Sequence, residues 1–266
     1  LETIGSTDRF DRKSLRELAE IEAVRVLLPE EPGGPASSLD LAAPNAVLLD
    51  ASLHGRMRLG CLVVDDLALP TGDDAAALDS ELQRAVEGLR AMWEHAGDLR
   101  EIPGINIGRH LYREVGIDAA RFVPRSEALV ASVLSGRDPE PAHPLAALAA
   151  LCMLRLRAPL ALYDADEIHT PVVVRSGADG ESYVDPARRR VVVEGRPVLA
   201  DAEGAFGSPI GDARRTAPGA QTRRVLAVFF LPPTADDASI RGLQDGVGRA
   251  LEVHAGGTPA VRLTVG

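Results

Sequence analysis

Residues 144–155 read Pro144-Leu-Ala-Ala-Leu-Ala-Ala-Leu-Cys-Met-Leu-Arg155 and are apolar on every face of a helix. A soluble protein tolerates such a helix only inside its core, so the segment predicts a central buried helix. Beyond Pro159 the hydrophobic period changes to two, as in Val172-Val173-Val174 and the run 225–231. Helices before Pro159 and strands after it favour a layered α+β fold over an alternating parallel sheet.

On both sides of this segment, the spacing of apolar residues predicts the remaining elements. Asp73 and Asp74 cap a helix whose apolar residues recur every three or four positions until Gly97 ends it. The further expected helices are 108–115, 126–134 and 239–253, and the further expected strands are 47–49, 59–64, 182–184, 191–193, 198–199 and a short one near 261–263.

The first 44 residues differ in character from the rest of the chain. Residues 8–28 are charged and amphipathic, and residues 29–35 read Pro-Glu-Glu-Pro-Gly-Gly-Pro, which breaks regular structure. We interpret residues 1–44 as a charged arm followed by a linker rich in proline and glycine, and we expect the folded domain over residues 45–266. The arm is a candidate docking segment for a protein partner.

The composition excludes several classes of function. Lys+Arg is 29 and Asp+Glu is 39, so the formal charge is −10 and any contact with nucleic acid must be local. Lys13 is the only lysine of the sequence, which argues against Schiff-base chemistry. Aromatic residues make up 3% of the chain, too few for rows of base-stacking rings.

Neither a cofactor nor a metal is expected. Cys61 and Cys152 stand far apart, without a Cys-x-x-Cys pair or nearby histidine ligands, so we interpret both as small buried apolar residues. No dinucleotide fingerprint, Walker loop, His-Glu-x-x-His or Gly-x-Ser-x-Gly occurs. The polar start and the lack of a run of about 18 apolar residues predict a cytoplasmic protein with no membrane partner.

Two segments carry candidate site residues, and the first reads Tyr163-Asp164-Ala-Asp-Glu-Ile-His169. Its carboxylates and imidazole suit acid–base chemistry better than a metal cage, because the spacing provides no convergent ligands. Tyr163 is a candidate substrate contact and Asp164 a candidate catalytic carboxylate. A polar turn after the core helix is the alternative interpretation.

The loop 205–216 is the first choice for the site, because its glycines let the backbone approach a ligand closely. Asp212 is the second candidate catalytic carboxylate and can orient an amine, while Arg214 and Thr216 can donate to a carboxylate or phosphate. A surface loop with a solvated ion pair is the alternative. The remaining candidate substrate contacts are Gly207, Ser208 and Gly211, together with His143, which precedes the core helix as a candidate general base or a simple helix cap.

Several short segments, read in order, are similar to one known family. They are Arg109-His-Leu-Tyr-Arg-Glu-Val-Gly-Ile-Asp118, Val123-Pro-Arg-Ser-Glu-Ala-Leu129, Pro159-Leu-Ala-Leu-Tyr-Asp164, Gly180-Glu181, Val198-Leu-Ala-Asp201, and Asp212-Ala-Arg-Arg-Thr216 continuing to Thr222-Arg-Arg-Val-Leu226. Over about residues 45–233 the chain resembles the freestanding B3/B4 domain proteins, named after the editing domain of the phenylalanyl-tRNA synthetase β subunit. The resemblance implies a β-sandwich of unusual topology covered by helices, and hydrolysis of aminoacyl esters.

The chain departs from that family at its pocket residues. The editing domain has a histidine two residues before the aromatic–Asp pair, where this chain has Ala161, and a glutamate that reads the tyrosine hydroxyl, where this chain has Val228. A tyrosine hydroxyl that faces valine loses its hydrogen-bond partner, so tyrosine editing is not expected. Ala149, Ala150 and Met153 in the core helix predict a more apolar pocket wall than the family usually has.

Two functions from different classes remain open. The first is a freestanding aminoacyl-tRNA deacylase, not tyrosine-specific, that works by substrate positioning and an activated water. Its RNA contacts would be the arginine groups at 188–190, 214–215 and 223–224. The second is a biosynthetic pocket that binds or transforms an amino-acid-like small molecule, free, tethered to a carrier or presented by a protein partner, with Asp164 or Asp212 as base or amine clamp. In a third version the pocket only binds an amino acid.

Overall fold

Strand β10 (Val225–Leu231) is buried along its whole length and lies inside a four-stranded antiparallel sheet of order β11-β2-β10-β3. The computed structural model describes residues 46–93 and 98–266. A strand that is covered on both faces must be apolar throughout, which explains the sequence Val-Leu-Ala-Val-Phe-Phe-Leu. The other strands of this sheet are β2 (Arg58–Asp65), β3 (Leu160–Asp164) and β11 (Thr258–Val265).

A second sheet has five strands in the order β1-β4-β7-β8-β9. Strand β1 pairs with β4 in parallel, and the remaining neighbours are antiparallel. Strands β5 and β6 form a separate hairpin. The bounds are β1 Val47–Leu49, β4 Val172–Ser176, β5 Ser182–Val184, β6 Arg190–Val192, β7 Pro197–Asp201, β8 Gly204–Ser208 and β9 Gly211–Asp212.

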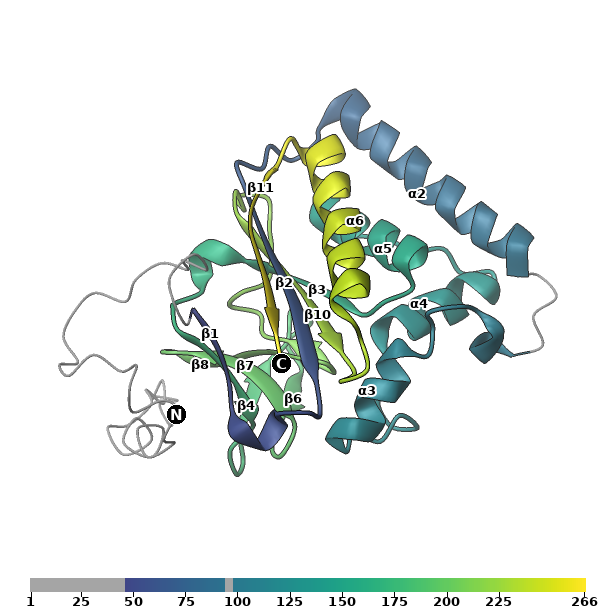
Figure 1. Ribbon diagram of the computed structural model, residues 1–266. Helices are drawn as coiled ribbons and strands as arrows, with labels where there is room; N and C mark the ends of the chain where they lie inside the picture. The colour runs from purple at the N-terminus through teal and green to yellow at the C-terminus, as the bar shows by residue number, and fades with distance from the viewer. Residues whose placement is uncertain (1–45, 94–97) are drawn as a thin grey trace, which may run out of the picture.

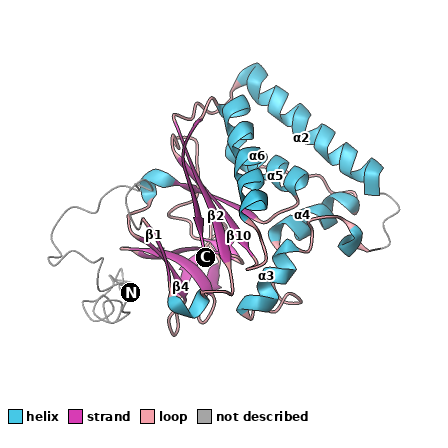
Figure 2. Ribbon diagram, in the orientation of Figure 1, coloured by secondary structure: helices cyan, strands magenta, loops and turns pink. Residues whose placement is uncertain are grey.

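The four-stranded sheet is sandwiched between helices on one face and the second sheet on the other (Figures 1 and 2). Leu62 and Val64 of β2 pack with the helices, whereas Cys61 and Val63 pack with the second sheet, because successive side chains of a strand point to opposite faces. The helices are α2 (Gly72–Trp93), α3 (Ile107–Val115), α4 (Arg125–Leu134), α5 (Pro144–Leu156) and α6 (Asp237–Ala255), with short 3-10 helices at Ala51–Leu53, Leu99–Glu101 and Ala165–Glu167.

The fold is α+β, as the order of helices and strands in the sequence predicts. The central apolar helix is confirmed as α5, which packs against α2, α4 and α6 and ends at Arg157 in the left-handed region. The two cysteines are free and buried, also as expected.

The sequence reasoning missed three strands of the site. Leu160–Asp164 is a strand, β3, and the segment expected to be a loop at 205–216 contains β8 and β9, which pair as a hairpin. Both strands of that hairpin are short and carry glycines, which weaken the sequence signal of a strand.

The interpretation of residues 1–44 as an arm and linker lies outside the described residues. Within the described part of the chain, no helix is long and apolar enough to cross a membrane.

Candidate functional site

All three tyrosines of the chain donate their hydroxyl groups to the β8–β9 hairpin. Tyr112, from α3, donates to the carbonyl oxygen of Pro209 at 2.8 Å. Tyr163, from β3, donates to Oδ1 of Asp212 at 2.7 Å, and Tyr183, from β5, donates to the carbonyl oxygen of Gly211 at 2.6 Å. Three separate elements therefore fix the position of the hairpin that carries Asp212.

Gly207 allows Tyr163 to reach Asp212. The two residues Gly207 and Asp212 lie opposite each other in the β8–β9 ladder. A Cβ atom on Gly207 would lie 2.2 Å from the Tyr163 hydroxyl oxygen, far inside van der Waals contact. Gly207 has no positive φ, so its backbone conformation does not require a glycine. The glycine is required because the Tyr163 hydroxyl packs directly against it.

Asp212 also forms an ion pair with Arg125, the first residue of α4. The guanidinium Nη1 contacts Oδ2 of Asp212, so both carboxylate oxygens are engaged, one by a phenol and one by a cation. The Asp212 side chain is 13% exposed and that of Arg125 is 33% exposed. The pair thus sits at the boundary between the core and solvent.

The protonation states in this network follow from burial and from the neighbouring charges. Burial and the nearby Asp212 raise the pKa of Tyr163 well above its ordinary value, so its hydroxyl keeps its proton and donates. Burial opposes the charge of Arg125, but Asp212 outweighs this effect and raises the pKa of Arg125. Burial also raises the pKa of Tyr183.

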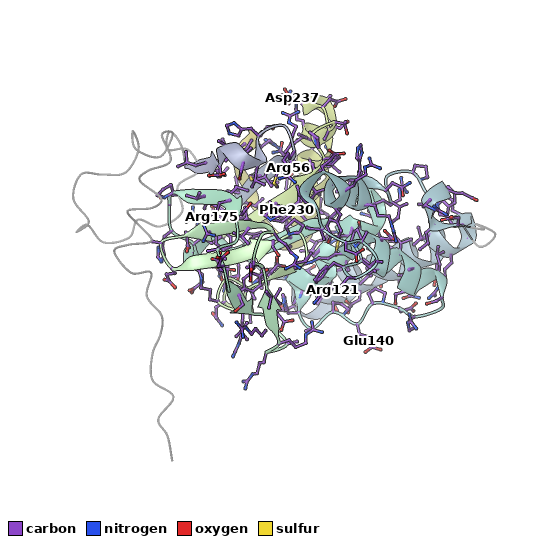
Figure 3. All side chains as sticks on the ribbon, turned by 90° about the horizontal axis from the view of Figure 1, so that it is seen from below. Arg56, Arg121, Glu140, Arg175, Phe230 and Asp237 are labelled. Carbon is purple, nitrogen blue, oxygen red and sulfur yellow. The ribbon has the colours of Figure 1, made fainter. Side chains whose placement is uncertain are left out.

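Asp212 and Arg125 line a cleft of about 780 Å³ between the α3–α4 connection, the β5–β6 hairpin and the β8–β9 turn. Arg121, which also lines this cleft, is labelled in Figure 3. Five arginines and two aspartates line it, which leaves three net positive charges in a chain of formal charge −10. The lining residues are Arg121, Phe122, Arg125, Asp185, Pro186, Arg189, Arg190, Val191, Val192, Arg196, Ile210, Gly211 and Asp212.

Only two of the five arginines are neutralised by an acidic partner within the described residues. Arg189 pairs with Asp185 at 2.8 Å, as Arg125 does with Asp212. The backbone N–H and guanidinium of Arg189 hold the pKa of Asp185 below its ordinary value, so Asp185 is ionised. The other three, Arg121, Arg190 and Arg196, form no ion pair with a described carboxylate, and they account for the positive charge of the cleft.

An aromatic ring lies between two of these cations. The guanidinium carbon of Arg121 is 5.1 Å from the centroid of the Phe122 ring, and that of Arg196 is 4.9 Å from it. Both distances are within the range of cation–π attraction. The contacts hold two guanidinium groups beside one aromatic ring on the wall of the cleft.

The structure brings most of the predicted substrate contacts to the hairpin. Gly207 and Asp212 meet Tyr163, and Gly211 accepts from Tyr183, as described above. Ser208 is buried, and its hydroxyl lies 2.8 Å from the Tyr183 hydroxyl and 3.1 Å from the Gly211 carbonyl oxygen. Ser208 therefore supports the hairpin, and it is not among the residues that line the cleft.

Asp164 does not line the cleft. It follows Tyr163 in β3 and so points to the other face of the strand. Its carboxylate accepts from the Thr222 hydroxyl at 2.6 Å and caps the 3-10 helix Ala165–Glu167 through the Asp166 amide.

Tyr163 and Gly207 also lie outside the cleft lining, as do three further predicted site residues. Thr216 is fully buried under the hairpin, and Arg214 is exposed, with its amide bonded to the Val184 carbonyl oxygen. His143 caps α5, where Nδ1 accepts from the Ala146 amide at 3.3 Å, and burial lowers its pKa.

The expected apolar wall is absent from this cleft. Helix α5, with Ala150 in its buried face, packs in the helix-side core and contributes no residue to the cleft lining. Ala161 and Val228, which replace the histidine and glutamate of the editing domain, are cross-strand partners, and both are buried in the sheet-side core. Packed apolar side chains thus occupy the two positions that carry the family's polar groups.

The sequence reasoning missed the arginines that give the cleft most of its charge. Of the three arginine groups expected to form one RNA patch, only one contributes to the cleft, through Arg189 and Arg190. In the other two groups, Arg215 pairs with Asp201 at 2.5 Å and Arg224 with Asp65 at 2.9 Å. Arg121 and Arg125 lie close together at the α3–α4 connection, whereas Arg196 lies between β6 and β7. The sequence feature that could have indicated the cleft is that Arg121 stands next to an aromatic residue in the short segment between two helices.

The chemical groups of the cleft limit what it can do. Its lining contains no serine, threonine, cysteine, lysine or histidine, so it offers no common side-chain nucleophile besides carboxylate. Within the described residues, no group of three or more histidine, cysteine, aspartate or glutamate side chains is placed to hold a metal ion. The arrangement is suited to binding anions and to stabilising negative charge.

Comparisons with known proteins give a distant structural likeness. No family model matches the chain, and no curated protein matches it. Among solved structures, an N-terminal fragment of the phenylalanyl-tRNA synthetase β-subunit from Pyrococcus horikoshii is similar, with a TM-score of 0.45 and 13% sequence identity. The alignment covers 88% of this chain and 56% of that one, so the chain spans little more than half of the fragment's length. A likeness at this level assigns no substrate.

Proposed function

We propose that the arginine cleft binds the acceptor end of an aminoacylated RNA and that the protein hydrolyses the aminoacyl ester. The observation that carries this proposal is the net positive charge of the cleft on an otherwise acidic chain. Phosphodiester groups pair well with arginine, because the planar guanidinium can donate two parallel hydrogen bonds. The rest of the acidic surface restricts that contact to a short segment of RNA.

The absence of a serine or cysteine nucleophile from the cleft lining favours direct attack by water. In this step the water oxygen bonds to the ester carbonyl carbon, the bond to the ribose oxygen breaks, and the products are a free amino acid and an RNA with a free hydroxyl group. Arginine side chains stabilise the negative charge that develops on the carbonyl oxygen. Positioning of the ester beside them supplies the rest of the rate enhancement.

The stack of Arg121, Phe122 and Arg196 favours a nucleotide over a simple anion. Arginine and aromatic side chains both stack on flat groups, and every nucleobase has a flat face. Phosphate contacts and one stacked base are therefore available on the same wall of the cleft.

A second candidate function is binding of a small amino-acid-like molecule. The cleft volume of about 780 Å³ falls within the range of small-molecule sites, roughly 300–1,000 Å³. The paired charges of Asp212 and Arg125 match the ammonium and carboxylate groups of an amino acid. This reading needs neither RNA nor turnover.

A panel of aminoacylated tRNAs and free amino acids tests both candidates, with hydrolysis and thermal shift measured on each. The informative variant is Arg190→Gln combined with Arg196→Gln, and its control is Arg84→Gln on the exposed face of α2. If RNA contacts these arginines, the negative slope of log K against log salt concentration should become less steep by about 0.7 for each arginine removed. Hydrolysis that is equal in both variants at low salt would contradict RNA binding here, and a thermal shift with free amino acids alone would favour the second candidate.

A further inference from the structure

We propose that Arg125 is the cation that contacts the anionic centre of the ligand, and that Asp212 and Tyr163 are positioning residues that hold it there. This inference deepens the proposed function, because it assigns roles within the same cleft. It also changes the role expected for Asp212, from a base that touches the substrate to a support for its neighbour.

The first argument is the occupancy of the Asp212 carboxylate. Oδ1 accepts from the Tyr163 hydroxyl at 2.7 Å and Oδ2 contacts Arg125, so both oxygens are already engaged by strong donors. Two of the roughly four acceptor positions of the carboxylate are thus taken, and each oxygen is tied to a fixed protein group. A carboxylate in this setting is suited to orienting its partner.

The second argument is the free part of Arg125. One nitrogen of its guanidinium faces Asp212, no other ion pair of Arg125 is found among the described residues, and a third of the side chain is exposed in the cleft. The fork of a guanidinium has five N–H donors, so several remain to bind a phosphate or carboxylate. An arginine that is already held in place loses less freedom when it binds.

The third argument is that Tyr163 is itself fixed. It is fully buried, and its ring makes an edge contact with Phe206 at a centroid distance of 5.3 Å. Its hydroxyl passes over Gly207, where any side chain would displace it. The chain of support therefore runs from the core through Tyr163 and Asp212 to Arg125 at the cleft.

The test compares Tyr163→Phe with Tyr112→Phe. Each change removes one buried hydroxyl that bonds the same hairpin and leaves the charge of the cleft unchanged, but only Tyr163 touches Asp212. Two readouts are measured: the Kd for inorganic pyrophosphate by calorimetry, and the rate at which phenylglyoxal modifies Arg125, followed by peptide mass spectrometry.

For Tyr163→Phe we expect Kd to rise about fivefold and modification of Arg125 to quicken several-fold, because the salt bridge loses its support. Tyr112→Phe should leave both readouts within about twofold, whatever its effect on thermal stability. A folded Tyr163→Phe protein with both readouts unchanged would overturn the positioning role.

A second variant keeps the inference testable if Tyr163→Phe does not fold. Arg125→Lys retains the charge but not the planar fork, and we expect it to weaken pyrophosphate binding about fivefold relative to an Arg84→Lys control. An unchanged Kd would overturn the assignment of Arg125. Failure of the proposed function is separable, since hydrolysis of the aminoacyl ester would then be absent while the pyrophosphate and phenylglyoxal results hold.

Discussion

At the scale of single residues, the buried phenols and thiols dominate the acid–base behaviour of the fold. Burial raises the pKa of Tyr112 to about 12 and those of Cys61 and Cys152 to about 12. Their unfolded values are lower, so the unfolded chain ionises first as the pH rises. The stability contributed by these groups is complete below about pH 9 and is lost above it.

We therefore predict that the free energy of unfolding is flat between pH 7 and 9 and then falls by about 1.4 kcal/mol per pH unit for each of these groups, once the pH exceeds its unfolded pKa. Urea denaturation at pH 7, 9 and 10 checks this. Because Cys61 is one of the two thiols, Cys61→Ala should have a shallower decline between pH 9 and 10. An equal slope in both proteins would argue against the perturbed thiol.

A second prediction at this scale concerns the contact between Gly207 and Tyr163. In Gly207→Ala the new methyl group lies 2.2 Å from the phenol oxygen, and we expect the free energy of unfolding to fall by about 1–3 kcal/mol. Gly219→Ala is the matched control, since nothing lies within 4 Å of its added Cβ. Adding Tyr163→Phe to Gly207→Ala should recover part of the loss, and strict additivity in a double-mutant cycle would exclude the steric explanation.

At the scale of elements, a charge cluster at the surface joins three helices. Glu81 of α2 contacts Arg155 of α5, and its other oxygen lies 3.0 Å from Nε2 of His254 in α6. Burial opposes ionisation of Glu81, but the hydrogen bond and charge of Arg155, together with His254, outweigh it and lower its pKa. The contribution of Glu81 is thus present above its unfolded pKa of about 4.5 and is lost as the pH falls through the folded value.

From this cluster we predict that Glu81→Gln lowers the free energy of unfolding by about 1–2 kcal/mol at pH 7, because Arg155 and His254 lose a charged acceptor. The difference from wild type should shrink as the pH falls below about 4.5. Glu87→Gln, an exposed change on the same helix, should cost little at either pH. A Glu81→Gln difference that persists at acid pH would show that shape, not charge, is responsible.

The element scale also shows which features the sequence encodes locally. The uniform apolar run of α5 and the all-apolar β10 could be predicted, because a segment buried on every side has no polar positions. Strand β3 and the short β8–β9 hairpin could not, since their pairing depends on β10 and β7, which are distant in sequence. The contact of Tyr163 with Asp212 and the approach of Arg196 to Arg121 and Arg125 depend on tertiary packing, because these residues come from distant segments.

At the scale of the whole molecule, the charge distribution separates the cleft from its surroundings. Three net positive charges line the cleft, while the full chain carries a formal charge of −10. Attraction to RNA is therefore local, and the screening length of about 8 Å at physiological salt keeps distant acidic groups from cancelling it. Those acidic groups do repel any RNA that extends beyond the cleft.

This balance predicts that a short RNA carrying only the acceptor end binds within about tenfold of the affinity of a full-length tRNA, since added phosphates meet acidic surface and release few counterions at protein cations. The slope of log K against log salt should be about −2 for both, because three cations without acidic partners each contribute about −0.7. Fluorescence anisotropy with a labelled acceptor-stem RNA and the matching tRNA at several salt concentrations measures both quantities. A tRNA that binds a hundredfold more tightly, with a much steeper slope, would place the main RNA contact outside the cleft.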